Sequence, residues 1–207
     1  MTKCNSINVL LSISLLFIIL NPAFGGTTPT KVIKKSNETI LDLYGKSPTV
    51  NNEILDGIFS VMDEITDFKI MAERAAQDTC KQSSPESCKQ LKLEFIQLLK
   101  LTATNKLGRY RADRFEYHGE DINDTQAIVK TTAHYEEDEV QLDYVLEKRN
   151  SKWVVVNYIT DEVDTIRNYR SQFNRITAKK SPEFLINRLK KKNEHYLNER
   201  AKKGQSK

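Results

Sequence analysis

The chain has 207 residues, enough for one domain with a sizeable hydrophobic core. Its 32 Lys and Arg residues exceed its 28 Asp and Glu by only four, and they are spread too widely to indicate a nucleic-acid-binding protein. The basic excess lies near the end of the sequence, where residues 188–207 hold eight Lys or Arg and two Glu. Such a tail can meet anionic headgroups or an acidic partner surface, or it can be a solvated helix end.

Residues 1–25 have the three parts of a secretory signal peptide. Lys3 supplies the positive start, residues 9–20 the apolar core, and Ala23-Phe24-Gly25 the small-x-small cleavage pattern. The apolar core is too short to span a bilayer. We therefore expect cleavage near Gly25, export, and a soluble mature protein that starts with a flexible segment over residues 26–36.

The remaining sequence alternates between helical and strand patterns in an order typical of an α+β domain. Four helices come first, over residues 37–44, 53–62, 67–76 and 85–107. A meandering antiparallel sheet of about four strands follows, with strands around Phe115 and Tyr117 and over residues 126–134, 140–146 and 153–159, and with a turn at 119–124. Two helices, 164–179 and 182–200, end the domain, and residues 196–207 are predicted to form a basic C-terminal tail.

Cys80 and Cys88 are the two cysteines that remain after cleavage of the signal peptide. An even number of cysteines in an exported protein favours a disulfide. Redox chemistry usually uses the closer Cys-x-x-Cys spacing, and a metal would need further ligands that are absent nearby. The intervening segment is a predicted turn between helices, with Ser84 as the cap and Pro85 at the first helical position, so we favour a structural disulfide.

The stretch from Val140 to Phe173 has the clearest pattern in the chain. Apolar and polar residues alternate over residues 140–147, as in a strand with one buried face. After a polar turn, residues 153–159 are apolar or aromatic except for Asn157, as in a strand covered on both faces. Asp164 then stands where a helix N-cap is needed, followed at helical spacing by Ile166, Tyr169, Phe173 and Ile176.

Four strings in and after this stretch match a known family: Val140–Tyr144 (VQLDY), Lys152–Val155 (KWVV), Tyr169–Ile176 (YRSQFNRI) and Phe184–Leu189 (FLINRL). They resemble the MlaC or toluene-tolerance family, periplasmic phospholipid-binding proteins that are the soluble component of an intermembrane phospholipid transport system. The resemblance covers roughly residues 39–192, and it departs from the family pattern at Glu162 and Asp164, where Gly and Ser are usual, and at Ala103, where Tyr is usual.

The resemblance implies an NTF2-like cone, a curved antiparallel sheet wrapped by helices, here in a domain over residues 37–195. It also implies a periplasmic carrier that takes phospholipid between an inner-membrane ABC transporter complex and an outer-membrane lipoprotein–porin complex. Phospholipid would be cargo, and no other cofactor is expected. Tyr169, Arg170 and Phe173 belong to the matching motif. Arg170 either caps or pairs within the fold or lies near the lipid headgroup.

An apolar pocket is the site that such a carrier needs. The inward side chains predicted for residues 126–134 are small and those for 140–146 are large, an arrangement that can leave a cavity or can let a helix pack closely. Each candidate lining residue can equally be ordinary core. The candidates are Leu98, Leu99, Val129, Leu142, Tyr144, Trp153, Val155 and Phe173.

Catalysis has little support in the sequence. His118, His134 and His195 have no partners at spacings that suggest a metal site or a triad, and no Gly-rich phosphate loop is present. We expect neither an enzyme nor a metal site. Two alternatives to the carrier remain open: a structural or adaptor protein with a filled core, and a small enzyme that works in a cavity.

Overall fold

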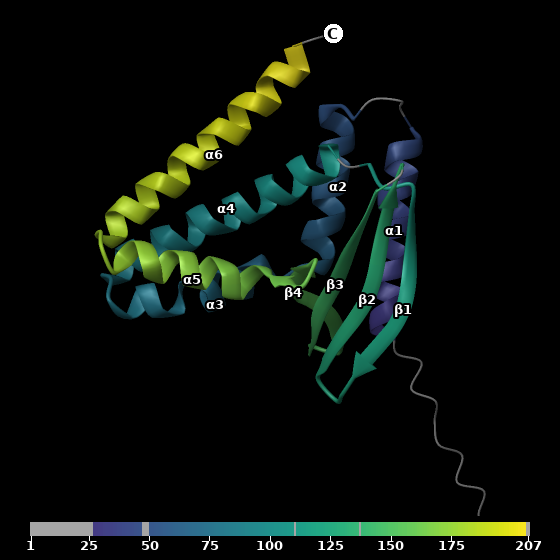
Figure 1. Cartoon of the computed structure of the whole chain (residues 1–207), viewed down its shortest axis with the longest axis horizontal. Helices are drawn as coiled ribbons and strands as arrows, with labels where there is room; N and C mark the ends of the chain where they lie inside the picture. The colour runs from purple at the N-terminus through teal and green to yellow at the C-terminus, as the bar shows by residue number, and fades with distance from the viewer. Residues whose placement is uncertain (1–26, 47–49, 110, 137, 206–207) are drawn as a thin grey trace, which may run out of the picture.

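The computed structural model describes residues 27–46, 50–109, 111–136 and 138–205 (Figure 1). The predicted signal peptide lies outside these residues. The helices of the described residues are α1 (Pro29–Gly45), α2 (Asn52–Ile65), α3 (Phe68–Lys81), α4 (Pro85–Arg109), α5 (Thr165–Thr177) and α6 (Pro182–Gln205). Its strands are β1 (Arg114–Ile122), β2 (Gln126–Tyr135), β3 (Asp138–Arg149), β4 (Lys152–Thr160) and β5 (Val163–Asp164).

The strands form one antiparallel meander in the order β1-β2-β3-β4-β5. The turn between β3 and β4 consists of Asn150 and Ser151, whose φ angles of +47° and +64° suit a tight hairpin. β5 adds a short fifth strand to the four that the sequence predicted. The predicted turn at 119–124 starts too early, because β1 continues to Ile122 through a bulge between Tyr117 and Gly119. Gly119 has a φ of +118° there.

Helix α1 starts earlier than the sequence analysis predicted. Residues 29–36, expected to be flexible, form its first two turns, because Thr28 caps the helix and Pro29 occupies its first turn. The backbone N–H and the hydroxyl of Thr30 both donate to Glu120 Oε2 of β1, at 2.8 and 2.7 Å. Ile33 is fully buried. Contacts with the sheet therefore order this segment.

The other helices lie beside the sheet, at the β4 and β5 end (Figure 1). The predicted caps are present, since Ser84 Oγ accepts from Ser87 N–H and Asp164 Oδ1 accepts from Arg167 N–H. α4 packs between α3 and α6. The predicted basic tail is helical up to Gln205 and continues α6. No helix of the described segments is long and apolar enough to cross a bilayer.

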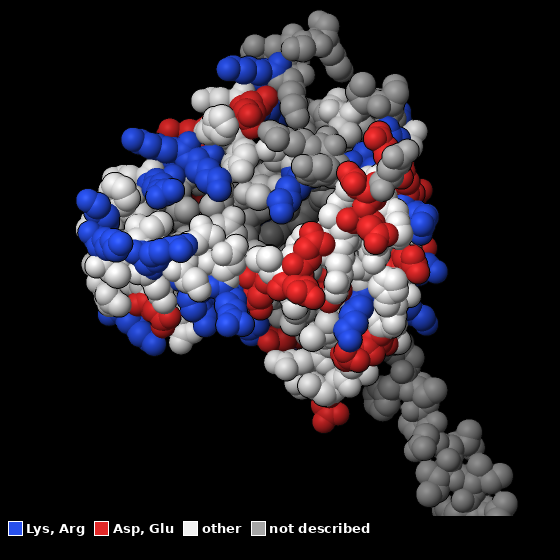
Figure 2. Space-filling view, viewed as in Figure 1, with Lys and Arg blue, Asp and Glu red and all other residues white. Residues whose placement is uncertain are grey.

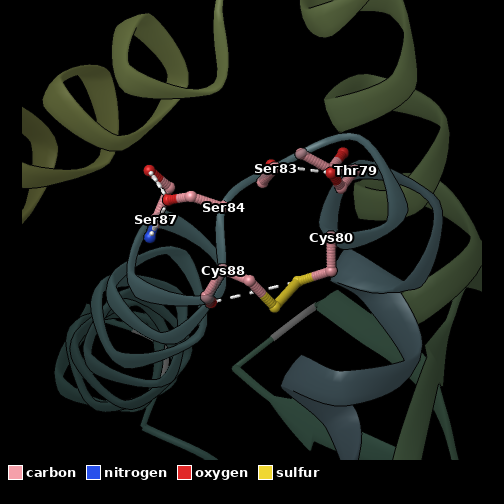
Figure 3. Close-up of a disulfide and its surroundings, with 6 residues drawn as sticks. All are labelled: Thr79, Cys80, Ser83, Ser84, Ser87 and Cys88. Atoms are coloured by element: carbon pink, nitrogen blue, oxygen red, sulfur yellow. Dashed lines mark hydrogen bonds between the residues drawn. A yellow bond between two sulfur atoms is a disulfide. The ribbon is translucent and has the colours of Figure 1, made fainter.

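Cys80 and Cys88 form the predicted disulfide (Figure 3). It joins the last turn of α3 to the first turn of α4, so the two helices are held together at one end. The Ser83 hydroxyl donates to the Thr79 carbonyl at 2.7 Å inside the same turn.

Most of the buried apolar side chains fall into two groups. The larger one, which we call the helical cluster, is made by side chains of all six described helices and includes Phe95, Leu98 and Phe173. The second, which we call the sheet cluster, lies between one face of the sheet and α1 and includes Ile33, Val129 and Trp153. The division matters for the candidate site, because the predicted pocket residues lie in both groups.

Candidate functional site

The sheet cluster contains most of the predicted lining. Tyr144 and Leu146 are buried on the same face of β3, as the alternation predicted, and Tyr144 pairs with Val129 of β2. Trp153 and Val155 come from β4 and complete the buried face. Leu142 is partly buried and packs at the margin of this group.

The remaining predicted residues, Leu98, Leu99 and Phe173, lie in the helical cluster. Here the Phe95 ring of α4 makes edge-on contacts with two rings of α5, at centroid distances of 4.7 Å to Tyr169 and 5.0 Å to Phe173. Two members of the family motif therefore serve to pack α5 against α4. The eight residues do not form one continuous lining in this conformation.

Tyr158 of β4 lies where the two clusters meet and packs against both. Its hydroxyl and that of Thr66 are hydrogen-bonded at 2.5 Å, and its ring is 5.6 Å from the Tyr144 ring. Beside it, the Asp67 N–H donates to the Val155 carbonyl at 2.9 Å. Burial raises the pKa of Tyr158 to about 12, although the hydrogen bond with Thr66 opposes the shift. The hydroxyl is therefore protonated at physiological pH.

A buried polar group sits inside the sheet cluster. Asn37 of α1 is 2% exposed, accepts from the Tyr144 hydroxyl at 3.0 Å, and donates through Nδ2 to the Tyr117 hydroxyl at 3.2 Å. Burial raises the pKa of Tyr144 far above its usual range, so this hydroxyl remains a donor. Sequence analysis missed Asn37. The helical spacing of Ile33, Asn37 and Ile40 was the signal that could have found it.

Arg170 pairs within the fold, one of the two roles considered for it. Its Nε–H donates to the Arg74 carbonyl of α3 at 2.8 Å, and the Arg74 guanidinium binds Glu147 of β3 at 2.6 Å. Burial by itself would raise the pKa of Glu147, but hydrogen bonds from Arg149 and Arg74 outweigh it, so the pKa lies below its usual range. Arg170 and Arg74 thus connect α5, α3 and the sheet.

Two hollows lie elsewhere, and none of the eight predicted residues lines either of them. One, of about 30 Å³, has room for roughly one water molecule. The other is an open hollow of about 530 Å³ on the sheet. The small one is lined by Leu55, Leu101, Thr104, Asn105, Tyr196, Glu199 and Arg200. The open one is lined by His118, Lys130, Thr132, Glu139, Gln141 and Asp161.

The three histidines make only surface interactions. His118 is 2.8 Å from the Thr132 hydroxyl, His134 is 3.3 Å from Glu116, and His195 is 3.6 Å from Glu199. Within the described ranges, no three His, Cys, Asp or Glu side chains come together as metal ligands would.

The described helices and the open antiparallel meander of this chain form an α+β, NTF2-like fold. Residues 31–191 match the family model described as MlaC protein, and the chain belongs to the MlaC family. Among solved structures, it is similar to the phospholipid-binding protein from Ralstonia solanacearum in complex with a phospholipid. That similarity has a TM-score of 0.64 and 23% sequence identity, over 80% of this chain and 97% of the other. No curated protein matches the chain.

Proposed function

We propose that this protein is a periplasmic phospholipid carrier that encloses acyl chains and moves lipid between inner- and outer-membrane complexes. The family match over residues 31–191 carries the proposal. The similar R. solanacearum protein, which is described as phospholipid-binding, supports the choice of cargo. The signal-peptide pattern of residues 1–25 supports the compartment.

The energetics define what the site must do. Moving a two-chain phospholipid into water exposes about thirty methylenes at roughly 0.8 kcal/mol each, a cost above about 20 kcal/mol. A shallow surface groove recovers only part of this. The site must therefore enclose most of both tails in apolar side chains, while the headgroup stays in water at the mouth. Headgroup selectivity is then expected to be weak.

We place the acyl chains between the two clusters, at the junction marked by Tyr158. Val129, Leu142, Tyr144, Trp153 and Val155 would form the sheet side. Leu98, Leu99 and Phe173 would form the helical side. The clusters would part when lipid enters, because six of the eight side chains are already in well-packed surroundings with at most 7% exposure. The junction is suited to this role, since a few polar contacts around Thr66 connect the two sides.

The carrier would act by binding and release and not by catalysis. Its pocket would make the free energy of the lipid comparable with that in a bilayer, so that loading and unloading both proceed. The proposed partners are an inner-membrane ABC transporter complex and an outer-membrane lipoprotein–porin complex. The second candidate function is an adaptor with a filled core, which the tight packing of the two clusters favours.

Native mass spectrometry of protein exported to the periplasm of a Gram-negative host distinguishes the carrier from the adaptor. A carrier is expected to retain phospholipid in a stoichiometric amount, with acyl chains identified after extraction. Protein that is lipid-free after export, and that takes up no phospholipid from vesicles, would exclude the carrier and leave the adaptor.

The Leu142→Arg variant tests the placement of the site. A guanidinium among acyl chains would be desolvated at a cost of several kcal/mol, so we expect lipid occupancy to fall at least about tenfold. Gln141→Arg is the matched control, because the adjacent Gln141 side chain is exposed on the opposite face of β3. Folded Leu142→Arg protein that keeps its lipid would refute the placement.

A further inference from the structure

Two parts of this molecule carry opposite excess charge. Residues 165–205, which form α5, α6 and the turn between them, contain twelve Lys or Arg and three Glu. Residues 114–160, which form β1 to β4, contain ten Asp or Glu and five Lys or Arg. Figure 2 shows this division, with Lys and Arg gathered over the helices on the left and Asp and Glu over the strands on the right.

Five exposed basic side chains lie along α6 and in the turn before it. Arg188, Lys191 and Lys192 are exposed and follow one another at helical spacing. Lys179 and Lys180, also exposed, lie in the turn before α6. We call these five residues the basic strip. From Phe184 to His195 the sequence contains one acidic residue, Glu194.

The described residues provide no fixed counter-charge for the strip. Among the described residues, no carboxylate lies within ion-pair distance of any of its five side chains. The neighbouring Glu183 instead accepts from the Ser87 hydroxyl of α4 at 3.0 Å, which turns its charge toward α4. The positive potential of the strip is therefore available to an external anion.

An exposed aromatic ring lies within the strip. Phe184 is 47% exposed, and the Lys180 ammonium is 5.9 Å from the centre of its ring. A ring of this kind surrounded by long cationic side chains suits the headgroup layer of a bilayer, where the ring enters the apolar boundary and the ammonium groups reach the phosphates. An acidic protein surface would satisfy the charges, but it would also need an apolar pocket placed to receive the ring.

We propose that the basic strip and Phe184 dock this protein on the surface of an anionic phospholipid bilayer. The partner is the membrane itself, recognised through its phosphate groups. The acidic sheet would be repelled from the same surface, so the molecule would bind with α6 toward the lipid. The inference extends the proposed function, because a carrier must reach a bilayer, but its test does not depend on bound cargo.

Co-sedimentation with vesicles tests the proposal. We expect the protein to bind mixed vesicles of phosphatidylcholine and phosphatidylglycerol, not to bind phosphatidylcholine alone, and to dissociate as salt is added. Each positive charge near such a surface contributes about a fivefold factor in affinity. The triple variant Lys180→Glu/Arg188→Glu/Lys191→Glu should therefore bind at least about a hundredfold more weakly, and Phe184→Ser about fivefold more weakly.

The matched control is Lys34→Glu/Lys35→Glu/Lys69→Glu, which changes the net charge equally at exposed positions of α1 and α3. It should bind nearly as well as the original chain. A second triple variant, Lys180→Gln/Arg188→Gln/Lys191→Gln, removes the same charges without adding new ones, so weaker binding can be separated from misfolding. Its thermal unfolding is measured in parallel.

Three results would overturn the proposal: no binding to anionic vesicles, equal loss in strip and control variants, or binding to polyglutamate without binding to vesicles. The last would indicate an acidic protein partner. Vesicle binding by protein that is lipid-free after export and takes up no phospholipid from the vesicles would support the docking surface while refuting the carrier. A lipid-loaded protein that does not bind vesicles would support the carrier and refute the docking surface.

Discussion

Glu162 occupies a backbone conformation that suits glycine. It lies with Asp161 in the turn between β4 and β5, at a φ of +66°. Left-handed geometry destabilises the folded state of a residue with a Cβ by about 1–2 kcal/mol. Glycine avoids this cost, but its greater freedom in the unfolded chain cancels part of the gain. Glu162→Gly should therefore stabilise the protein by about 0.5–1 kcal/mol, measured by urea denaturation.

Glu162→Ala is the control for this prediction, because it removes the same charge but keeps the Cβ. It should give little or no stabilisation. Equal gains from Ala and Gly would show that charge, and not backbone geometry, limits stability at this turn. Family members usually carry glycine here, and the backbone geometry explains that preference, while Asp164 caps α5 as the usual Ser would.

Asn37 and Tyr144 form a buried pair whose members depend on each other. Removing either one leaves a buried polar atom without its partner, so Asn37→Ala and Tyr144→Phe should each cost about 1–3 kcal/mol of unfolding free energy. In the double variant both partners are gone, and the total should fall short of the sum by about 1–2 kcal/mol. Chemical denaturation of the four proteins measures this coupling. Strict additivity would contradict the pairing.

Residue-level prediction from the sequence succeeded where a local pattern decides the outcome. The alternation in β3 correctly placed Tyr144 and Leu146 on one buried face, and Asp164 was correctly identified as a cap. It failed for Asn37, whose burial depends on Tyr117 and Tyr144, residues 80 and 107 positions away. No local pattern encodes which distant hydroxyl groups will meet a buried amide.

The α3–α4 hairpin is the element whose stability depends most directly on a covalent bond. The Cys80–Cys88 disulfide closes a short loop, and the chain-entropy model gives about 2.5 kcal/mol for a loop of this size. The variant Cys80→Ser/Cys88→Ser should lose about that amount of unfolding free energy. Reductant should destabilise the original chain equally and leave the variant unchanged. A variant as stable as the original would mean that helix packing alone holds the hairpin.

Element boundaries were predictable where capping and turn residues mark them, as at Ser84-Pro85 and Asp164. They were missed where tertiary contacts extend an element. α1 begins at Pro29 because Ile33 and Thr30 contact the sheet, although Lys31, Lys34 and Lys35 make the segment look like a polar terminus. β1 continues past Gly119 because β2 supplies hydrogen-bond partners up to Ile122. The strand therefore has a bulge where glycine would usually mark a turn.

At the scale of the whole molecule, the sequence pattern predicted an α+β domain and the family resemblance implied an NTF2-like fold, but neither indicated the division of the core. Leu98, Leu99 and Phe173 share the apolar character of Val129 and Val155, so the side chains themselves do not show which of them lie together. The packing of α4 against α3 and α6 separates the two sets. Tyr158 packs against both sets, and it lies where they meet. This division makes the junction the place where a lipid-dependent change is expected.

Tyr158→Phe tests whether the junction controls lipid exchange. The change removes the hydrogen bond to Thr66, so the closed junction should lose about 1 kcal/mol, and lipid transfer from vesicles should accelerate by about fivefold. Fluorescent phospholipid transfer measures the rate. Tyr44→Phe is the matched control: it removes another buried hydroxyl, bonded to the Leu107 carbonyl at 2.7 Å, away from the junction. It should destabilise the fold without changing the transfer rate. Equal acceleration in both variants would mean that general loosening, and not opening at Tyr158, admits the lipid.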